Sequence, residues 1–225
     1  MNEEIKKIAD EQLLVQLYQN NLFSLKSICQ LLGAWDNYSP KDQFTLENFT
    51  KRDSNINKHF TYEGVYNKNY TYGEVLRSGT DIIIEKINRY KKPNSSDVFI
   101  DIGSGSGKLV IHTAIKTEIS TLIGIEIVPQ RVAYSKYIKD KFPINNKAIF
   151  FIEKDIKDFD LSIVNIAFMN NLTWDRDVIY DVYNRLKKGC HIISSIEIPE
   201  CKILKEEFYV DASWGMKLRL HYYIK

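Results

Sequence analysis

The sequence has few cysteines and prolines and no long apolar run. Its three cysteines form no CxxC pair, so neither a disulfide framework nor a zinc site is indicated, and a reducing intracellular compartment fits best. No stretch approaches about 18 apolar residues, and the N-terminus lacks a basic start followed by an apolar run. We therefore expect neither a secretion signal nor a membrane span.

A large excess of charge of one sign is also missing. The net charge is +2, from 31 basic and 29 acidic residues, which is far from the charge of a strongly basic nucleic-acid-binding module. Contact with a polyanion would have to come from local basic clusters, most of which we expect to be solvated faces. These clusters lie at residues 51–58, 86–92, 136–147 and 185–188.

The length of 225 residues allows one α/β domain with a small appendage. Residues 2–33 carry apolar positions at helical spacing, which predicts two amphipathic helices, whereas residues 34–73 are irregular and rich in polar and aromatic side chains. We therefore predict a helical and irregular N-terminal subdomain at residues 1–66. The main domain is expected at residues 67–225.

The main domain alternates short apolar runs with helical stretches, which predicts a mostly parallel sheet with right-handed crossovers. Its last two runs are separated only by the turn around Gly215, and they predict an antiparallel hairpin that completes a seven-stranded sheet. Strands are expected at residues 98–103, 121–127, 148–153, 162–168, 190–196, 208–214 and 217–224. Helices are expected at residues 81–90, 107–116, 129–141 and 175–188.

A glycine-rich loop follows the first of these strands. Gly103, Gly105 and Gly107 would let the backbone turn sharply there and approach a ligand closely. Lys108 stands where a hydride-transfer dinucleotide fingerprint needs glycine, and the GKS or GKT of a phosphate-binding P-loop is absent. The loop is therefore that of another nucleotide cofactor.

Three acidic residues at successive strand ends indicate which cofactor. Asp101 beside the glycine loop is poorly suited to a pyrophosphate but well suited to a ligand that carries ammonium and sulfonium charges. Glu126 lies where ribose hydroxyls are typically held, and Asp155 can hold an adenine amino group. Each carboxylate alone could simply cap a helix. The three together favour S-adenosylmethionine.

A second motif, AFMNNLTWD at residues 167–175, follows the fourth strand, where ligands bind in open α/β folds. With this motif, the chain resembles the DOT-type (disruptor of telomeric silencing) histone lysine methyltransferases over residues 70–225. The other matching pieces are YGEV (72–75), DIGSGSG (101–107), GIE (124–126), GCHIISS (189–195) and the terminal SW…YY of residues 213–223.

The resemblance implies a Rossmann-like class I methyltransferase fold, with S-adenosylmethionine as methyl donor, S-adenosylhomocysteine as product and no metal. It implies a lysine in the folded core of nucleosomal histone 3 as the substrate, and hence a nuclear or other chromatin setting. The cofactor-binding residues would be Tyr72, Glu74, Asp101, Gly103, Gly105, Gly107, Lys108, Glu126, Asp155, Ile156, Phe168 and Asn170. The residues lining the lysine channel would be Asn170, Ser195, Trp214, Tyr222 and Tyr223.

Three positions depart from the family pattern. Val75 replaces a threonine, Lys108 replaces a glutamine, and Ile156 replaces an aromatic residue that packs on adenine. Cofactor binding is expected to survive these changes, whereas the methylation rate is open. A long lysine-rich tail, which supplies nucleosomal DNA affinity in relatives, is absent, so local basic patches would have to make any DNA contact.

Two alternatives remain open. The substrate could be a lysine of a non-histone protein, or the chain could be a catalytically weak module that binds a partner through its N-terminal helices. The histidines show no carboxylate pattern and are expected to be structural or exposed; they are His59, His112, His191 and His221. The sequence does not indicate an oligomeric state.

Overall fold

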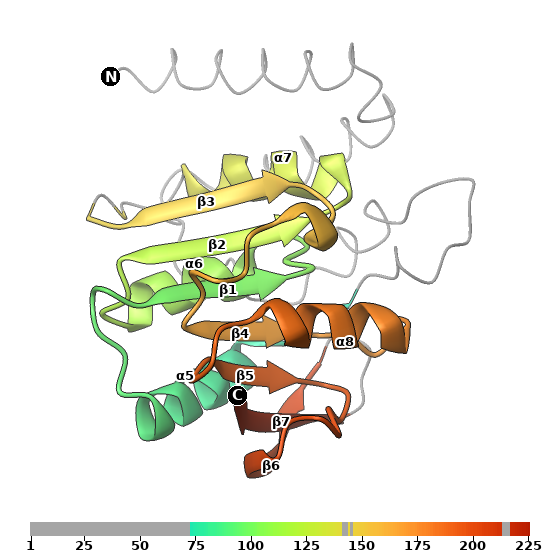
Figure 1. Ribbon diagram of the computed structural model, residues 1–225. Coiled ribbons are helices and arrows are strands. Elements are labelled where there is room, and N and C mark those ends of the chain that lie inside the picture. The colour runs from blue at the N-terminus through green and yellow to red at the C-terminus, as the bar shows by residue number, and fades with distance from the viewer. Residues whose placement is uncertain (1–72, 141–143, 145, 213–216) are drawn as a thin grey trace, which may run out of the picture. The chain divides into compact units, whose positions relative to one another are not determined.

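A computed structural model describes residues 73–140, 144, 146–212 and 217–225 (Figure 1). The predicted N-terminal subdomain and its boundary at residues 66 and 67 lie outside the described residues, as do Tyr72, Trp214 and the turn at Gly215. In the part of the chain that is described, no helix is both long and apolar enough to cross a membrane.

The described residues build a seven-stranded sheet with the strand order β3-β2-β1-β4-β5-β7-β6. Strands β1 to β5 run parallel, whereas β7 pairs antiparallel with both β5 and β6. This arrangement confirms the predicted parallel sheet with a terminal hairpin. The bounds are Val98–Ile102 (β1), Thr121–Glu126 (β2), Ala148–Glu153 (β3), Ile166–Met169 (β4), His191–Ser194 (β5), Ile203–Asp211 (β6) and Lys217–Ile224 (β7).

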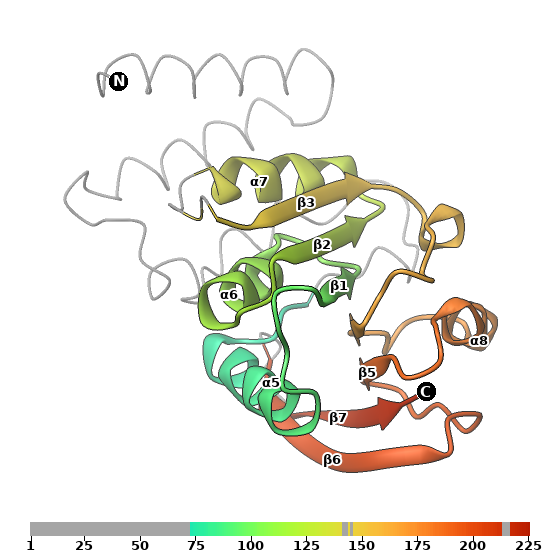
Figure 2. The ribbon, with the colours of Figure 1, turned by 60° about the vertical axis from the view of Figure 1, so that its left-hand side comes forward.

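Helices cover both faces of the sheet. Figure 2 shows α5, α6 and α7 on one face, and α8 with the short 3₁₀ helix η2 on the other. Strands buried on both faces are expected to be almost wholly apolar, and β4 (IAFM) and β1 (VFIDI, with one polar residue) fit this pattern. The helix bounds are Arg77–Tyr90 (α5), Lys108–Lys116 (α6), Pro129–Lys139 (α7), Arg176–Arg185 (α8) and Ile156–Asp158 (η2).

Several predicted boundaries differ from the observed ones, each for a local reason. The strand expected from residue 162 begins only at Ile166, because the preceding residues form a turn in which Ser162 N donates to Asp160 Oδ1 at 2.9 Å. Strand β6 begins five residues before the predicted position, because Ile203 pairs with Ile224 of β7.

Helix α5 begins at Arg77, four residues earlier than predicted, because the hairpin holds its first turn. Leu76 N donates to Asp211 O at 2.9 Å, and Ser78 Oγ donates to Asp211 Oδ2 at 2.9 Å. A Cβ on Gly79 would lie 2.9 Å from Asp211 O, so only glycine allows this close approach. The hairpin thereby fixes the segment that leads from Gly73 into α5.

The core on the α8 face of the sheet contains residues of β1, β2, β4, β5 and β7. Tyr223 of β7 belongs to this core, whereas Tyr222 packs on the opposite face, with its ring centroid 4.9 Å from that of Tyr90 in α5. Successive side chains of a strand point to opposite faces, which accounts for this separation. Other members of the core are Ile100, Ile102, Ile123, Ile125, Ala167, Met169, Ile179, Val182, Leu186 and Ile192.

Candidate functional site

A cavity of about 440 Å³ lies over the carboxyl ends of β1, β2, β3 and β4. This is the edge of an open α/β sheet where ligands bind, and the volume is within the range of about 300–1,000 Å³ that is usual for ligand sites. Ten of the predicted cofactor-binding residues line it: Glu74, Asp101, Gly103, Gly105, Lys108, Glu126, Asp155, Ile156, Phe168 and Asn170.

The glycine loop between β1 and α6 forms the floor of this cavity. Gly103, Gly105 and Gly107 have φ values of 79°, 53° and 78°, in the left-handed region that favours glycine. The loop is held against the end of β2, because Gly103 N and Ser104 N both donate to Ile125 O, at 2.8 and 2.9 Å. The alternating glycines therefore produce a backbone curve that ordinary residues would resist.

Glu126, at the end of β2, ties the glycine loop to the start of α7. Its Oε2 accepts from Gly105 N at 3.0 Å, and its Oε1 accepts from Ile127 N and Val128 N, both at 2.9 Å. An ionised carboxylate has about four acceptor positions, so three backbone donors leave room for one further donor. Glu126 therefore organises the loop and also faces the cavity.

Asp101 is buried in the cavity wall near the glycine loop. Burial, and to a lesser extent the charge of Glu126, raises the pKa of its carboxyl group to about 8. The carboxyl group is therefore mainly protonated at neutral pH when nothing positive lies beside it. A ligand that brings a cation to this wall would favour its ionisation.

Asp155 follows β3, and the structure is consistent with its being both a helix cap and a residue of the cavity. Its Oδ1 accepts from Lys157 N at 3.0 Å, so it caps η2, and the same residue lines the cavity. Ile156 is buried beside it.

The cavity is less acidic than the sequence suggested. Glu74 accepts from Ser106 Oγ at 2.5 Å and from Lys108 Nζ at 2.6 Å, so Lys108 balances one carboxylate. Arg131 Nη1 lies 3.6 Å from Glu126 Oε1 and balances a second. Asp101 and Asp155 are the remaining acidic groups among the lining residues.

The segment after β4 forms the opposite wall. Phe168 stands directly opposite Asp101 in the pairing of β4 with β1, and Asn170 follows at the end of the strand. The Oδ1 atom of Asn170 and the Oγ atom of Ser104 are buried and have no hydrogen-bond partner among the described residues. Buried polar atoms are normally paired, so both are expected to bond a ligand or water.

Of the predicted site residues that the structure describes, four are not among those that line the cavity. The Tyr222 side chain packs on the α5 face of the sheet, with its hydroxyl 3.0 Å from His191 Nδ1, and the Tyr223 hydroxyl accepts from Ile198 N at 3.2 Å. Ser195 is bonded to the neighbouring Asn171, and Gly107 forms the N-cap of α6. The structure therefore does not bring Ser195, Tyr222 or Tyr223 to the cavity with Asn170.

Trp174 is the most informative lining residue that the sequence analysis left without a role. Its ring lies against the glycine loop, since a Cβ on Gly103 would be 3.6 Å from Trp174 Cζ2. It belongs to the NNLTW motif, four residues after Asn170, so the motif itself could have indicated that Trp174 is a site residue. Further lining residues without a predicted role are Ser104, Ser106, Ile127, Arg131, Lys154, Lys157, Leu172, Thr173 and Val178.

Two of the histidines have carboxylate neighbours that the sequence pattern does not show. His112 does have a carboxylate partner, because its buried Nε2 lies 2.9 Å from Asp81 Oδ1, and His221 Nδ1 lies 3.5 Å from Glu207 Oε1. The spacing within one element could not indicate these pairs, because each partner lies on another element. Neither histidine lines the cavity, and His59 lies outside the described residues.

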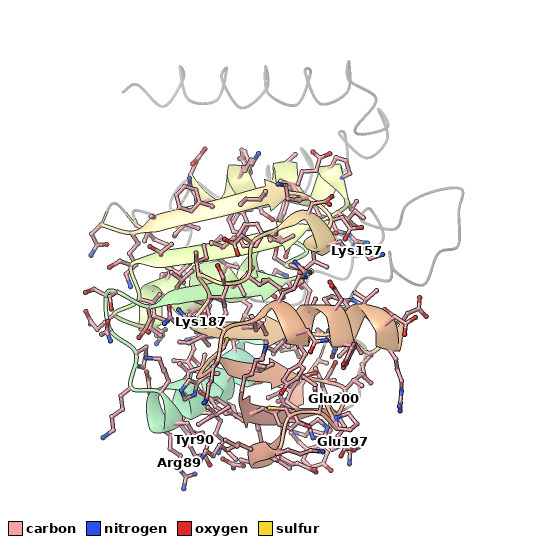
Figure 3. All side chains as sticks on the ribbon, in the orientation of Figure 1. Arg89, Tyr90, Lys157, Lys187, Glu197 and Glu200 are labelled. Carbon is pink, nitrogen blue, oxygen red and sulfur yellow. The ribbon has the colours of Figure 1, made fainter. Side chains whose placement is uncertain are left out.

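Some members of two predicted basic clusters pair with carboxylates of the protein. Lys86 pairs with Glu206 at 2.9 Å, Lys91 with Asp97 at 2.8 Å, and Arg185 with Asp181 at 2.7 Å. Figure 3 shows Lys157 at η2, Lys187 beyond α8 and Arg89 at the end of α5, each in a different part of the molecule. The cluster at residues 51–58 lies outside the described part of the chain. Within that part, no group of three or more histidine, cysteine or acidic side chains could hold a metal ion.

Comparison with known proteins decides the family. The sequence matches the family described as histone methylation protein DOT1 over residues 52–212, which is well over half of the chain. The chain belongs to the DOT1 family. The glycine loop, the carboxylates and the NNLTW segment all lie within the matched residues.

A curated relative of this DOT1 chain is a Caenorhabditis elegans protein named histone-lysine N-methyltransferase, H3 lysine-79 specific. The two are 28% identical over 174 residues, which is 69% of this chain and 17% of the relative. The chain thus spans about a sixth of the relative's length.

Solved structures include an RNA methyltransferase from Salinibacter ruber in complex with S-adenosyl-L-homocysteine, with 19% identity and a TM-score of 0.47 over 64% of this chain and 90% of that one. TrmN from Thermus thermophilus has 13% identity and a TM-score of 0.49 over 64% of this chain and 48% of that one. The strand order and the family together assign the fold of the DOT1 chain: it is a mostly parallel, seven-stranded α/β sheet of the Rossmann-like methyltransferase class.

Proposed function

We propose that the chain is an S-adenosylmethionine-dependent protein lysine N-methyltransferase. The observation that carries the proposal is the Asn170 carboxamide oxygen, a buried acceptor without a described partner in a cavity that the glycine loop and Asp101 also line. Membership of the DOT1 family supports the same activity.

The lining residues suit S-adenosylmethionine at the level of chemical groups. Asp101 and Glu74 can hold an ammonium group, Glu126 retains an acceptor position for a ribose hydroxyl, and Asp155 can accept from an amino group of adenine. The glycines would let the backbone approach the ligand, and Ile156 and Phe168 offer apolar surface. When bound, S-adenosylmethionine supplies an electrophilic methyl group on a sulfonium centre.

The protein's own residues would act mainly by positioning and by excluding water. Phe168 and Trp174 would shield the reaction site, and a lysine amine that enters this apolar surrounding would lose its proton more readily, because burial disfavours the charged form. Asn170 Oδ1 would accept a hydrogen bond from that amine and orient it. We assign no general base.

The substrate we propose is a lysine in the folded core of nucleosomal histone 3, which would place the protein in chromatin. The name of the Caenorhabditis elegans relative supports this choice. Lys154 and Lys157 line the rim of the cavity and are candidates for contact with nucleosomal DNA phosphates, which would make binding fall steeply with salt. We also propose the domain division at residues 66 and 67.

Methyl transfer from radiolabelled S-adenosylmethionine tests the proposal. The protein is incubated with nucleosomes, free histones and a cell extract, and we expect label on nucleosomal histone 3. Asn170→Ala is the matched variant, because it removes the acceptor and leaves the glycine loop unchanged. Label on another protein alone would overturn the histone substrate, and no label in any of the three mixtures would overturn the activity.

A further inference from the structure

Asn171, the residue after Asn170, is completely buried and joins the loop after β4 to the end of β5. Four donors of the adjacent segment lie within hydrogen-bond distance of its Oδ1: Ser194 Oγ at 3.1 Å, Ser195 N at 3.1 Å, Ser195 Oγ at 2.9 Å and Ile196 N at 3.1 Å. In the other direction, Asn171 N donates to Ser195 Oγ at 2.8 Å. One side chain thus holds two loops together at the carboxyl edge of the sheet.

The loop held in this way carries two residues that line the cavity, Asn170 and Trp174. Asn170 precedes Asn171 directly, and Trp174 N donates to Asn171 O at 3.1 Å, which closes a turn. This turn sets the Trp174 ring against Gly103 in the glycine loop. A shift of Asn171 would therefore move both the orphaned acceptor of Asn170 and the ring of Trp174.

The fold itself depends less on these bonds than the loop does. Ser195 N also donates to Met169 O at 3.2 Å, and Ile196 N also lies 3.3 Å from Ser194 Oγ. Ser194 Oγ has Ile196 O as a second acceptor, at 2.6 Å. Three of the four donors thus retain a partner if the Asn171 carboxamide is lost. The end of β5 would keep its backbone bonds, whereas the Asn170 to Trp174 loop would lose its side-chain anchor and keep only the bond from Asn171 N to Ser195 Oγ.

We infer that Asn171 is a positioning residue: its carboxamide oxygen fixes the loop that presents Asn170 and Trp174 to the reacting groups, and Ser195 acts through it. Ser195 is therefore part of this support, and it is not among the described residues that line the cavity. The inference rests on the proposed methyl transfer for its functional consequence, but the loop's position can be measured without it.

The test compares Asn171→Leu, which has a similar volume and no acceptor, with Asn171→Asp, which keeps an oxygen toward the four donors. Asn165→Leu is the matched control, because Asn165 Oδ1 accepts from Val98 N at 3.0 Å at the opposite edge of the same sheet. Full-length proteins are labelled with 5-fluorotryptophan. The Trp174 resonance is assigned by its loss in Trp174→Phe.

In Asn171→Leu we expect the Trp174 fluorine resonance to shift or broaden, and the amide of Asn171 to lose hydrogen-exchange protection. We expect kcat to fall by about 100-fold, the effect of a displacement near 1 Å, with a much smaller change in the S-adenosylhomocysteine Kd. Asn171→Asp should restore the resonance and most of kcat. Asn165→Leu should leave both unchanged.

An unchanged Trp174 resonance and unchanged amide exchange in Asn171→Leu would overturn the inference, whatever the activity. Equal losses of kcat in Asn171→Leu, Asn171→Asp and Asn165→Leu would also overturn it, because they would indicate general destabilisation. If the wild-type protein transfers no methyl group, the proposed function fails, while the resonance and the exchange rates still decide whether Asn171 positions the loop.

Discussion

Asp101 is the residue whose ionisation is most closely linked to ligand binding. Burial raises the pKa of its carboxyl group from 3.8 to about 8, and the charge of Glu126 adds to the effect. A cationic ligand beside it would favour the ionised form and lower this pKa again. Binding of a sulfonium compound and loss of a proton are therefore coupled.

We predict that S-adenosylmethionine binding at pH 7 releases a proton from Asp101. Calorimetric titrations in buffers of different ionisation enthalpy measure this release, and the observed enthalpy should depend on the buffer. The release should disappear above pH 9, where the empty protein is already ionised, and in Asp101→Asn. A binding enthalpy that is independent of the buffer at pH 7 would contradict the prediction.

The same carboxyl group should affect stability in the ligand-free protein. Because the pKa is raised in the folded state, its contribution is fully present below the unfolded value of 3.8 and is lost as the pH rises through about 8. The free energy of unfolding should therefore decline over this interval more in the wild type than in Asp101→Asn. Urea unfolding at several pH values measures the difference, and parallel curves would refute the assignment.

Gly107 and Gly189 have nearly the same backbone conformation, with φ values of 78° and 80°, and very different surroundings. A Cβ on Gly107 would lie 2.5 Å from the Phe151 ring, whereas one on Gly189 would meet nothing within 4 Å. Gly189→Ala should cost about 1–2 kcal/mol from the left-handed conformation alone.

We predict a larger loss of stability for Gly107→Ala, because the steric clash adds to the same backbone strain. Chemical denaturation of the two variants measures the difference directly. Equal losses would show that Phe151 moves aside at no cost, and the close packing of the glycine loop on β3 would then be irrelevant to stability.

At the scale of elements, the end of α8 supports the cavity from outside. Arg185 donates from Nη2 to Ile156 O at 3.0 Å and from Nη1 to Phe159 O at 2.8 Å, so it holds the segment that contains η2. Lys225 Nζ bonds the carbonyl oxygens of Tyr183 and Asn184 at 2.7 and 2.8 Å in the last turn of α8. One cation therefore supports a cavity wall, and the other supports the helix end.

Arg185→Lys should weaken S-adenosylhomocysteine binding, because lysine cannot make the two-pronged contact that positions Ile156. We expect a rise in Kd of about tenfold, corresponding to about 1.4 kcal/mol. Lys225→Met is the control, and it should lower the free energy of unfolding by about 1–2 kcal/mol with little change in Kd. Calorimetry and urea unfolding of both variants are needed, and a reversed pattern would disprove this division of roles.

Across the whole molecule, local patterns predicted the sheet well, whereas they do not determine how the side chains of the last strand are placed. The apolar runs and the glycine loop depend on neighbouring residues, so the strands and ten of the residues that line the cavity followed from the sequence. The placement of Tyr222 and Tyr223 depends on the register of β7 against β5 and on strand alternation, which motif spacing does not contain. Motif spacing also could not predict pairs between residues of distant elements, such as His112 with Asp81 or Asn171 with Ser195.

The central claim is that the cavity over the carboxyl edge of the sheet is the cofactor site. Calorimetric titration of S-adenosylhomocysteine into the wild type and into Gly103→Arg tests it most directly, because an arginine at this position would fill the cavity beside Trp174. We predict saturable one-to-one binding to the wild type and no binding to a folded Gly103→Arg protein. Binding retained in the folded variant would contradict the account.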